Sequence, residues 1–250
     1  MGSHSATISS MASTPSEGRR PYDSPRRREQ AAGTRKLILT EAQRLFERDG
    51  YAATSVAAIA KAAGVALKTV YLTFDTKAGV LRAVWHRALR GDRDEVPVGE
   101  QDWFRKVMDE PDPARRLRLS ARNSRMVKER AAAIMEVIHA AASGDPEIGE
   151  LWARIKQDFH ANQREIVESL ARDRALRQGL GVEAAADIMW TLNQPMQYQL
   201  LVGDRGWTPA RYERWLGDLF CSQLLRPEAQ GARSSKRGKP SSGSGSQGTA

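Results

Sequence analysis

Residues 54–74 read TSVAAIAKAAGVALKTVYLTF. Thr54 or Ser55 can cap a first helix with its hydroxyl, and the apolar residues that follow recur at helical spacing. Gly64 comes next, where the chain must turn and a left-handed conformation suits a residue without a Cβ. A second helix then starts near Ala66. Two short helices joined at a glycine corner are the pattern of a helix-turn-helix.

The second of these helices turns only two apolar side chains inward. Val70 and Phe74 are four residues apart and therefore share one face. The same arrangement of two amphipathic helices around a glycine also occurs in all-helical proteins that never contact nucleic acid, so the flanking residues must decide. The side chains left for the other faces are Leu67, Lys68, Thr69, Tyr71, Leu72 and Thr73.

The flanks of this segment supply two more helices. Residues 34–50 carry an apolar stripe closed by Gly50 and Tyr51, and Thr76 can cap a helix that starts at Lys77. With these flanks, residues 34–81 resemble the N-terminal DNA-binding domain of the TetR family of transcriptional regulators. The positions that carry the resemblance are Ile38, Ala42, Leu45, Phe46, Asp49, Gly50, Tyr51, Thr54, Ser55, Val56, Ile59, Ala60, Ala63, Gly64, Val65, Thr69, Val70, Tyr71, Phe74 and Lys77.

The resemblance implies a role for individual residues. For Tyr71 the alternative is a hydroxyl packed on a neighbouring helix. The residues expected to contact phosphate, by hydroxyls, basic groups and helix N-termini, are Thr34, Arg35, Thr54, Tyr71 and Lys77. Those expected to read bases are Ala66, Leu67, Lys68, Thr69, Leu72 and Thr73.

Two positions depart from the family pattern. Ala66 stands where a serine or threonine often caps the recognition helix, and Thr73 stands where histidine or tyrosine is common. Both lie on or beside the expected DNA-facing surface, so the operator sequence cannot be transferred from relatives. Gly79 is a third oddity, because glycine inside a helix costs roughly 1 kcal/mol relative to alanine unless close packing requires it.

The formal charge of +9 is unevenly distributed along the chain. Residues 34–90 hold ten Lys or Arg against four Asp or Glu, whereas residues 91–225 hold nineteen against twenty-two. The excess of positive charge therefore lies in the expected DNA-binding segment and in the two tails. A basic segment beside a near-neutral one favours binding to nucleic acid through one part of the molecule.

Beyond residue 90 the pattern remains helical, with breaks at glycine and proline clusters. These breaks predict helices of about 10, 29, 33, 21 and 17 residues, and the third stretch is long enough to divide. We therefore predict an all-α fold with an N-terminal three-helix helix-turn-helix domain and a C-terminal helical ligand-binding and dimerisation domain. The predicted divisions are a disordered basic tail (1–33), the DNA-binding domain (34–81), the helical domain (82–226) and a disordered Gly/Ser/Lys/Arg tail (227–250).

Several features bear on the compartment and on the tails. No apolar run approaches the length of a membrane span, and no signal peptide is recognisable. The single cysteine, Cys221, fits a reducing cytoplasm and is expected to be buried in the last helix. Arg26, Arg27 and Arg28 precede the first expected helix and could either add DNA affinity or merely solubilise the tail.

A single helix-turn-helix reads only a few base pairs, so a homodimer on a palindromic operator is expected. The last two long helices, 182–202 and 209–225, carry broad apolar stripes that could meet a partner. The alternative is that both stripes face the protomer's own core. The expected dimerisation residues are Ile188, Leu192, Met196, Tyr212, Trp215 and Leu219.

The middle helices combine aromatic, thioether and hydrogen-bonding side chains of the kind that lines ligand pockets, although such stripes also form ordinary cores. Pro195 predicts a kink, beside which Asn193 and Gln194 could bind a ligand or satisfy the freed carbonyl. His139 on an apolar face could equally be a hydrogen-bonded core residue. The candidate ligand-binding residues are Trp103, Met126, Met135, His139, Trp152, Phe159, Trp190, Asn193, Gln194 and Tyr198.

These observations favour a DNA-binding transcriptional regulator. Its partners would be double-stranded DNA, a second copy of itself and a small, largely apolar effector that releases it as a repressor. No catalytic motif, cofactor motif or metal-ligand spacing is recognisable, so no catalytic residue, cofactor or metal is expected. The alternatives are a general DNA-binding protein without an effector and an all-helical enzyme.

Overall fold

The computed structural model describes residues 25–90 and 101–230, and every regular element in these two ranges is helical. An isolated antiparallel bridge joins Leu176 to Leu225. The predicted all-α fold is confirmed. The elements are α1 (Pro25–Ala53), α2 (Val56–Ala62), α3 (Leu67–Phe74), α4 (Lys77–Arg90), α5 (Asp102–Met108), α6 (Pro113–Ala141), α7 (Pro146–Arg172), α8 (Val182–Leu192), α9 (Pro195–Tyr198), the π-helix η2 (Gln199–Asp204), α10 (Pro209–Leu224) and the 3₁₀ helix η3 (Pro227–Gln230).

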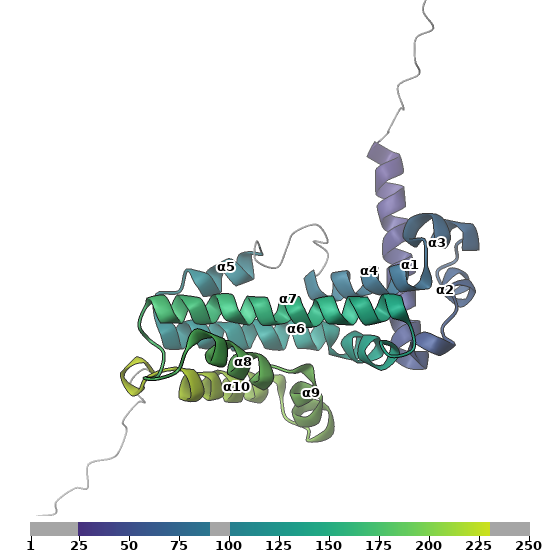
Figure 1. Cartoon of the computed structure of the whole chain (residues 1–250). Coiled ribbons are helices and arrows are strands. Elements are labelled where there is room, and N and C mark those ends of the chain that lie inside the picture. Colours follow the sequence, from purple (N-terminus) through teal and green to yellow (C-terminus); the bar gives the residue numbers. More distant parts are fainter. Residues whose placement is uncertain (1–24, 91–100, 231–250) are drawn as a thin grey trace, which may run out of the picture.

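The long helices α6 and α7 run side by side through the molecule (Figure 1). The first four helices gather at one end of this pair, and α8 and α10 pack along it toward the other end. α10 packs mainly on α6, and α8 mainly on α7. α4 contacts both α1 and α6, so it joins the N-terminal helices to the rest of the fold.

The N-terminal helices form around a small apolar core. Ile38, Ala42 and Phe46 recur at helical spacing on α1, are fully buried, and meet Val70 and Phe74 of α3 in the same cluster. The main helical run of α1 ends at Gly50, whose φ of 78° is in the left-handed region. Gly64 has a φ of 66° at the corner between α2 and α3, where the chain bends by 112°. The helix-turn-helix geometry follows from these two glycines and the shared core.

Two clusters of buried side chains fill the described part of the molecule. The first extends from α1–α4 into the second half of α6 and the first half of α7. The second joins α5, the first half of α6, the second half of α7, α8 and α10. The predicted domain boundary at 81/82 therefore falls inside α4, which carries buried residues such as Leu81 and Val84 on consecutive turns. The packing of the DNA-binding helices does not stop at that boundary.

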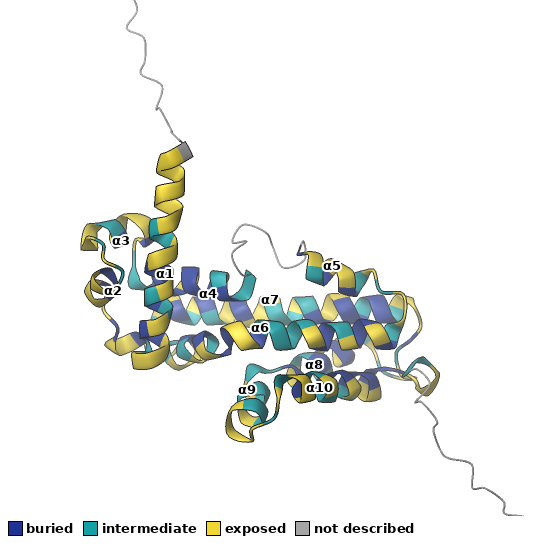
Figure 2. Ribbon diagram, turned by 180° about the vertical axis from the view of Figure 1, so that it is seen from behind, coloured by how far each residue is buried: buried dark blue, intermediate teal, exposed yellow. Residues whose placement is uncertain are grey.

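Both predicted tails are shorter than expected. α1 begins at Pro25, so residues 25–33 are helical and not part of a disordered tail. Proline suits the first turn of a helix, and the arginines, Gln30 and alanines that follow are good helix formers. Side chains 26–33 are all exposed, so intrinsic propensity and not burial accounts for these turns (Figure 2). At the other end, Pro227–Gln230 forms a 3₁₀ turn; the rest of the two predicted tails, 1–24 and 231–250, lies outside the described residues.

One of the long predicted helices ends early, and another is divided. The stretch after Pro146 ends at Arg172, where a turn with Arg174 at a φ of 53° separates α7 from α8. The predicted helix 182–202 breaks at Asn193 and Gln194, because Pro195 cannot donate a backbone hydrogen bond and instead starts a new helix. The chain then continues through the π-helix to Gly206.

Among residues 25–90 and 101–230, no single helix is long and apolar enough to cross a membrane. Only the α2–α3 pair taken together reaches that length and composition, and it is bent by 112°.

Candidate DNA interface and internal cavity

The outer face of α3 presents several large side chains to solvent. Leu67 is 43% exposed, Tyr71 48% and Leu72 78%, while Lys68 and Thr73 are also exposed. The buried residues of the same helix pack into the core, so the helix holds these exposed side chains in place. For Tyr71, the exposure argues against the alternative of a hydroxyl packed on a neighbouring helix. A short exposed helix with one cation and apolar side chains suits contacts with guanine and thymine methyl groups in a major groove.

The first turn of α3 differs from the usual pattern. Ala66 occupies the N-cap position and provides no side-chain hydrogen bond, and Thr69 is held there by its amide donating to the Ala66 carbonyl at 2.9 Å. The departure noted in the sequence therefore changes the cap itself. Thr73, the second departure, donates its hydroxyl to the Thr69 carbonyl at 2.7 Å on the exposed face.

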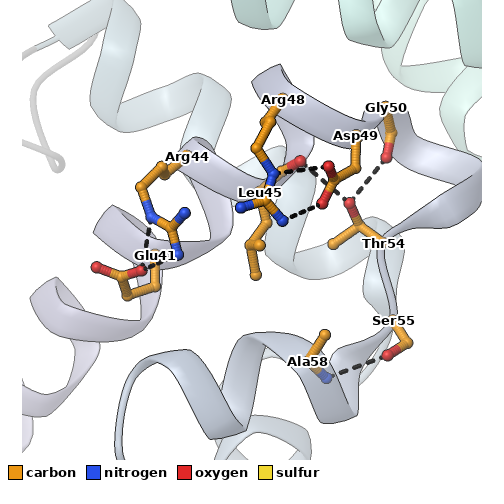
Figure 3. Close-up of polar contacts among 9 residues, drawn as sticks. All are labelled: Glu41, Arg44, Leu45, Arg48, Asp49, Gly50, Thr54, Ser55 and Ala58. Carbon is orange, nitrogen blue, oxygen red and sulfur yellow. Dashed lines mark hydrogen bonds and ion pairs between the residues drawn. The ribbon is translucent and has the colours of Figure 1, made fainter.

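Thr54 does not contact phosphate through its side chain, and this prediction is wrong. Its side chain is 2% exposed, and Oγ1 donates to the carbonyls of Gly50 at 2.8 Å and Leu45 at 3.3 Å (Figure 3). The hydroxyl is used to close the end of α1, where Gly50 leaves helical geometry. The exposed neighbour Ser55 is the N-cap of α2, accepting from the Ala58 amide at 3.1 Å.

The remaining predicted phosphate contacts are partly exposed and partly engaged within the domain. Lys77 Nζ donates to the Tyr51 carbonyl at 2.9 Å and lies 4.2 Å from the centre of the Tyr51 ring. The Arg35 guanidinium lies 4.8 Å from the centre of the Phe74 ring, so it links α1 to the end of α3. Thr34 lies one residue earlier on α1 and is also half-buried. These basic groups therefore orient the helices as well as supplying positive charge.

α4 is fastened tightly to the DNA-binding helices. Arg87 donates to Thr40 Oγ1 and to Gln43 Oε1 of α1, both at 2.9 Å. Gly79 lets α4 approach α3, because a Cβ at this position would lie 2.0 Å from the Phe74 carbonyl oxygen. This contact explains the glycine inside a helix that the sequence left unexplained.

The start of α7 touches the same end of the molecule. Tyr51 donates its hydroxyl to Asp145 Oδ2 at 2.9 Å, and Thr76 donates to Glu147 Oε2 at 3.2 Å. Burial, together with the bond to Asp145, raises the pKa of the Tyr51 phenol above its ordinary value. α7 is therefore joined to α1 and to the start of α4 by direct hydrogen bonds.

A partly open cavity of about 380 Å³ lies where α4, α5, α6 and α7 meet. Its walls are largely apolar, with a small number of polar groups from α4, α6, α7 and the residues after α8. This size and composition are typical of a small-molecule site. The lining side chains are Trp85, His86, Leu89, Arg90, Trp103, Phe104, Val107, Ser120, Asn123, Ser124, Val127, Lys128, Met135, Ile155, Asp158, Phe159, Ala161, Asn162, Gln163, Ile166, Asn193 and Pro195.

Lys128 is the most unusual residue of this lining. It is 5% exposed, and Nζ donates to Asn193 Oδ1 at 2.7 Å and to the Tyr212 hydroxyl at 2.8 Å. Ser124 also donates to Asn193 Oδ1. None of the ion pairs found in the described ranges includes Lys128. Burial lowers the pKa of the Lys128 ammonium well below its ordinary value.

Four of the ten predicted ligand-binding residues line the cavity: Trp103, Met135, Phe159 and Asn193. The other six, Met126, His139, Trp152, Trp190, Gln194 and Tyr198, do not line it. Met126, His139 and Trp152 lie on α6 and α7, two of the helices that form the cavity, and the other three lie on or next to α8 and α9. The ring of His139 stacks on Trp152 at 4.9 Å, Tyr198 meets Tyr212 edge-on at 5.0 Å, and Gln194 Nε2 donates to the Trp190 carbonyl at 3.0 Å.

Sequence reasoning missed Lys128 and Gln163, although a signal for Lys128 exists. Lys128 lies seven residues after Ala121 and three before Ala131, on the buried stripe of α6. A lysine at an apolar position of a helical period indicates a buried amine with a specific partner.

The predicted dimerisation residues divide into two groups. Tyr212 is fully buried beneath Lys128 and cannot reach a partner, so this prediction is wrong. Met196 is 54% exposed, and Ile188, Leu192, Trp215 and Leu219 are half-buried. Trp215 packs against Trp207 at 6.0 Å within the same chain.

Comparison with known proteins agrees with this arrangement. The profile of the family "Bacterial regulatory proteins, tetR family" matches residues 38–84. The HTH-type transcriptional regulator AcrR of Shigella flexneri is 26% identical over 202 residues, which cover 76% of this chain and 81% of AcrR.

Two solved structures share the fold. NalD, the secondary repressor of the MexAB-OprM multidrug efflux pump in Pseudomonas aeruginosa, matches with a TM-score of 0.61 and 23% identity, covering 78% of this chain and 98% of NalD. The SmeT–triclosan complex matches with a TM-score of 0.61 and 19% identity, covering 79% and 94%. Residues 38–84 thus form a helix-turn-helix domain of the TetR family of transcriptional regulators, and the helical body behind it shares the fold of NalD.

Proposed function

We propose that this protein is a homodimeric repressor that binds a palindromic operator and leaves it when a small, largely apolar effector enters the cavity. The observation that carries the proposal is the course of α4. Its C-terminal turns supply Trp85, His86 and Leu89 to the cavity wall. Arg87 in the same turns fastens the helix to α1, and the first turn of α4 abuts the end of α3 at Gly79.

On the DNA side, α3 of each protomer would enter a major groove. Lys68 and Thr69 supply hydrogen bonds to base edges, and Leu67 supplies an apolar contact. The base-reading surface then comprises Ala66, Leu67, Lys68, Thr69, Leu72 and Thr73, and Thr34, Arg35, Tyr71 and Lys77 contact phosphates. We assign DNA binding to 34–81 and effector binding and dimerisation to 82–226, in a protein that acts in the cytoplasm without catalysis.

Release follows from a two-state mechanism. Two recognition helices must enter successive major grooves at once, so a state with a different spacing binds the operator poorly. An effector shifts the population only if it binds that second state more tightly. α4 is suited to couple the two sites because it lines the cavity and packs on α1 and α3. The hydrogen bonds of Tyr51 and Thr76 to the start of α7 give a second route.

SmeT was solved with triclosan, a small molecule, in the same fold. That complex supports an effector for this chain, and NalD, a repressor by its description, supports repression over activation. A general DNA-binding protein would have no use for a largely apolar cavity next to α4.

Footprinting of the DNA upstream of the protein's own gene tests the proposal. We expect protection of a palindrome, with an affinity that falls with salt and exceeds that for random DNA by at least about 10³-fold. Addition of a ligand that fills the cavity should then remove the protection. Equal affinity for a palindrome and for random DNA would contradict the proposal and favour the general DNA-binding protein.

A further inference from the structure

The chemical class of the effector can be inferred from the polar end of the cavity. Lys128 is a buried amine on the cavity wall, and its two acceptors, Asn193 Oδ1 and the Tyr212 hydroxyl, are uncharged. An ammonium group has three N–H donors. Within the described residues, two of these are used, so one remains for an oxygen atom of a ligand.

The oxygen atoms around Lys128 are already committed. Asn193 Oδ1 accepts from both Ser124 and Lys128, and Asn193 Nδ2 lies 3.5 Å from Gln163 Oε1. Asn193 is 2% exposed, so this network holds the amine in one position. Burying an ammonium is costly unless an opposite charge pairs with it or the group gives up its proton, and the described residues place no carboxylate there.

The charged side chains of the lining also favour an anionic ligand. Lys128, His86 and Arg90 are basic, and Asp158, an exposed residue, is the single acidic side chain among the described lining residues. The rest of the wall is uncharged and largely apolar, with side chains such as Trp85 and Phe104. Such a site is complementary to a molecule with an apolar body and one anionic group.

We propose that the effector is a small apolar acid, such as an aromatic carboxylate, whose anionic oxygen binds Lys128 Nζ. This inference rests on the proposed function, because it assumes that the cavity is the effector site. The acid body lies against the aromatic wall, and the acid group reaches the Ser124–Lys128–Asn193 network.

Binding of an acid should change the protonation of Lys128. Burial lowers the pKa of Lys128 in the free protein, and an anion beside it favours the charged form. Above that lowered pKa, binding of an acid therefore takes up a proton, whereas binding of a neutral analogue does not. The titratable groups on the cavity lining or close to Lys128 include His86, Arg90, Arg125, Glu129, Asp158, Tyr198, Tyr212 and Glu213.

A pair of matched probes tests the proposal by isothermal titration of the full chain. The two probes, 2-naphthoate and 2-naphthamide, have nearly the same shape and differ in charge. We expect the protein to bind 2-naphthoate at least about tenfold more tightly, because a hydrogen bond to a charged group is worth that much. Titrations in buffers of different ionisation enthalpy should show proton uptake with 2-naphthoate only.

The variant Lys128→Met removes the amine and keeps the unbranched stem. It should abolish the preference for 2-naphthoate and the proton uptake, while 2-naphthamide binding, which reports an intact cavity, is retained. Lys156→Met is the matched control, since Lys156 is an exposed lysine on α7 that does not line the cavity. It should keep both the preference and the proton uptake.

Three results would overturn the inference. The first is equal binding of the two probes, and the second is an undiminished preference for 2-naphthoate in Lys128→Met. The third is the absence of proton uptake when the unmodified protein binds 2-naphthoate, a measurement that does not depend on whether the variant folds. In these cases the cavity can still be the effector site for a neutral molecule. Binding of neither probe would remove both the inference and the effector part of the proposed function, while operator binding would stand on its own footprinting test.

Discussion

Thr54 and Ser55 are adjacent hydroxyl residues whose side chains leave the backbone in opposite directions. Thr54 turns inward and donates to the carbonyls that end α1, whereas Ser55 faces solvent and caps α2. The sequence predicted a cap at one of the two but not which one. Their roles follow from burial, because an inward hydroxyl must find an acceptor and an exposed one is free to cap a helix.

We expect Thr54→Val to lower the free energy of unfolding by about 1–2 kcal/mol, since the Gly50 carbonyl loses its buried donor without a change of side-chain volume. Urea denaturation measures this loss. Ser55→Ala is the companion variant and should cost about 1 kcal/mol through loss of the cap. In Thr54→Val the salt dependence of DNA binding should be unchanged; a shallower dependence would restore Thr54 as a phosphate contact.

Lys68 is the one cation among the exposed side chains of α3 itself. Lys68→Ala should lower the affinity for the operator by about 1–3 kcal/mol and relax the preference at one or two base pairs. Selection from randomised oligonucleotides measures that preference. Lys106→Ala, at an exposed lysine on α5, is the control for loss of charge alone. An unchanged preference in Lys68→Ala would refute the base-reading role.

Cys221 is buried in α10 with Sγ 3.6 Å from the Ala114 carbonyl oxygen, as the sequence predicted for a free cysteine. Burial raises the pKa of the thiol to about 11. The native thiol therefore stays protonated between pH 9 and 11, where the unfolded thiol is ionised, so this group makes unfolding easier as pH rises. At pH 8 an aromatic disulfide reagent should label the native protein far more slowly than the protein in urea. Equally fast labelling in both would contradict the burial.

At the scale of elements, the approach of α4 to α3 depends on Gly79. Replacing glycine by alanine in a helix interior normally raises the free energy of unfolding by roughly 1 kcal/mol. We expect Gly79→Ala instead to lower it by more than that amount, because the new Cβ would lie 2.0 Å from the Phe74 carbonyl oxygen. Gly33→Ala is the matched control. Gly33 lies inside α1 with nothing within 4 Å of a Cβ, so the same change should stabilise the protein. Thermal unfolding compares the two variants. A higher stability in both would contradict the close contact at Gly79.

The elements that sequence could predict are those with strong local signals. Gly64 and Pro209 mark a turn and a helix start, and Asp145 caps α7 through its side chain as expected. The break at Asn193 was predicted only as a kink, because a proline permits either outcome and the buried contacts of Asn193 with α6 decide. The helical start at Pro25 was missed because exposed basic turns have no apolar period.

The cavity was only partly predictable for a different reason. A helical period shows which residues share a face, but not which neighbouring helix that face meets. Trp103 and Phe159 face the cavity, whereas Trp152 lies on the same helix as Phe159 and contacts His139 instead. Lys128 could be recognised as a buried amine, yet its role depends on Asn193 from a distant part of the chain. Sites assembled from several helices need the tertiary structure.

A dimer needs an apolar surface through which the two protomers meet. Met196 at 54% and Leu200 at 48% are large apolar side chains exposed on α9 and the π-helix, beside α10. Together with the half-buried Ile188, Leu192, Trp215 and Leu219 of α8 and α10, they are the candidate residues for a four-helix interface. Exposed apolar patches of this kind mark association surfaces.

We therefore expect the double variant Met196→Glu, Leu200→Glu to sediment as a monomer where the unmodified protein sediments as a dimer, because two like charges would face their copies across the twofold axis. Binding to a palindrome should fall to the affinity for a single half-site, since one α3 then reads half of the sequence. Leu37→Glu places the same charge on α1, at a residue 57% exposed and far from α9 in the chain, and should leave the dimer intact. A double variant that still sediments as a dimer would move the interface elsewhere, and with it the spacing of the two recognition helices.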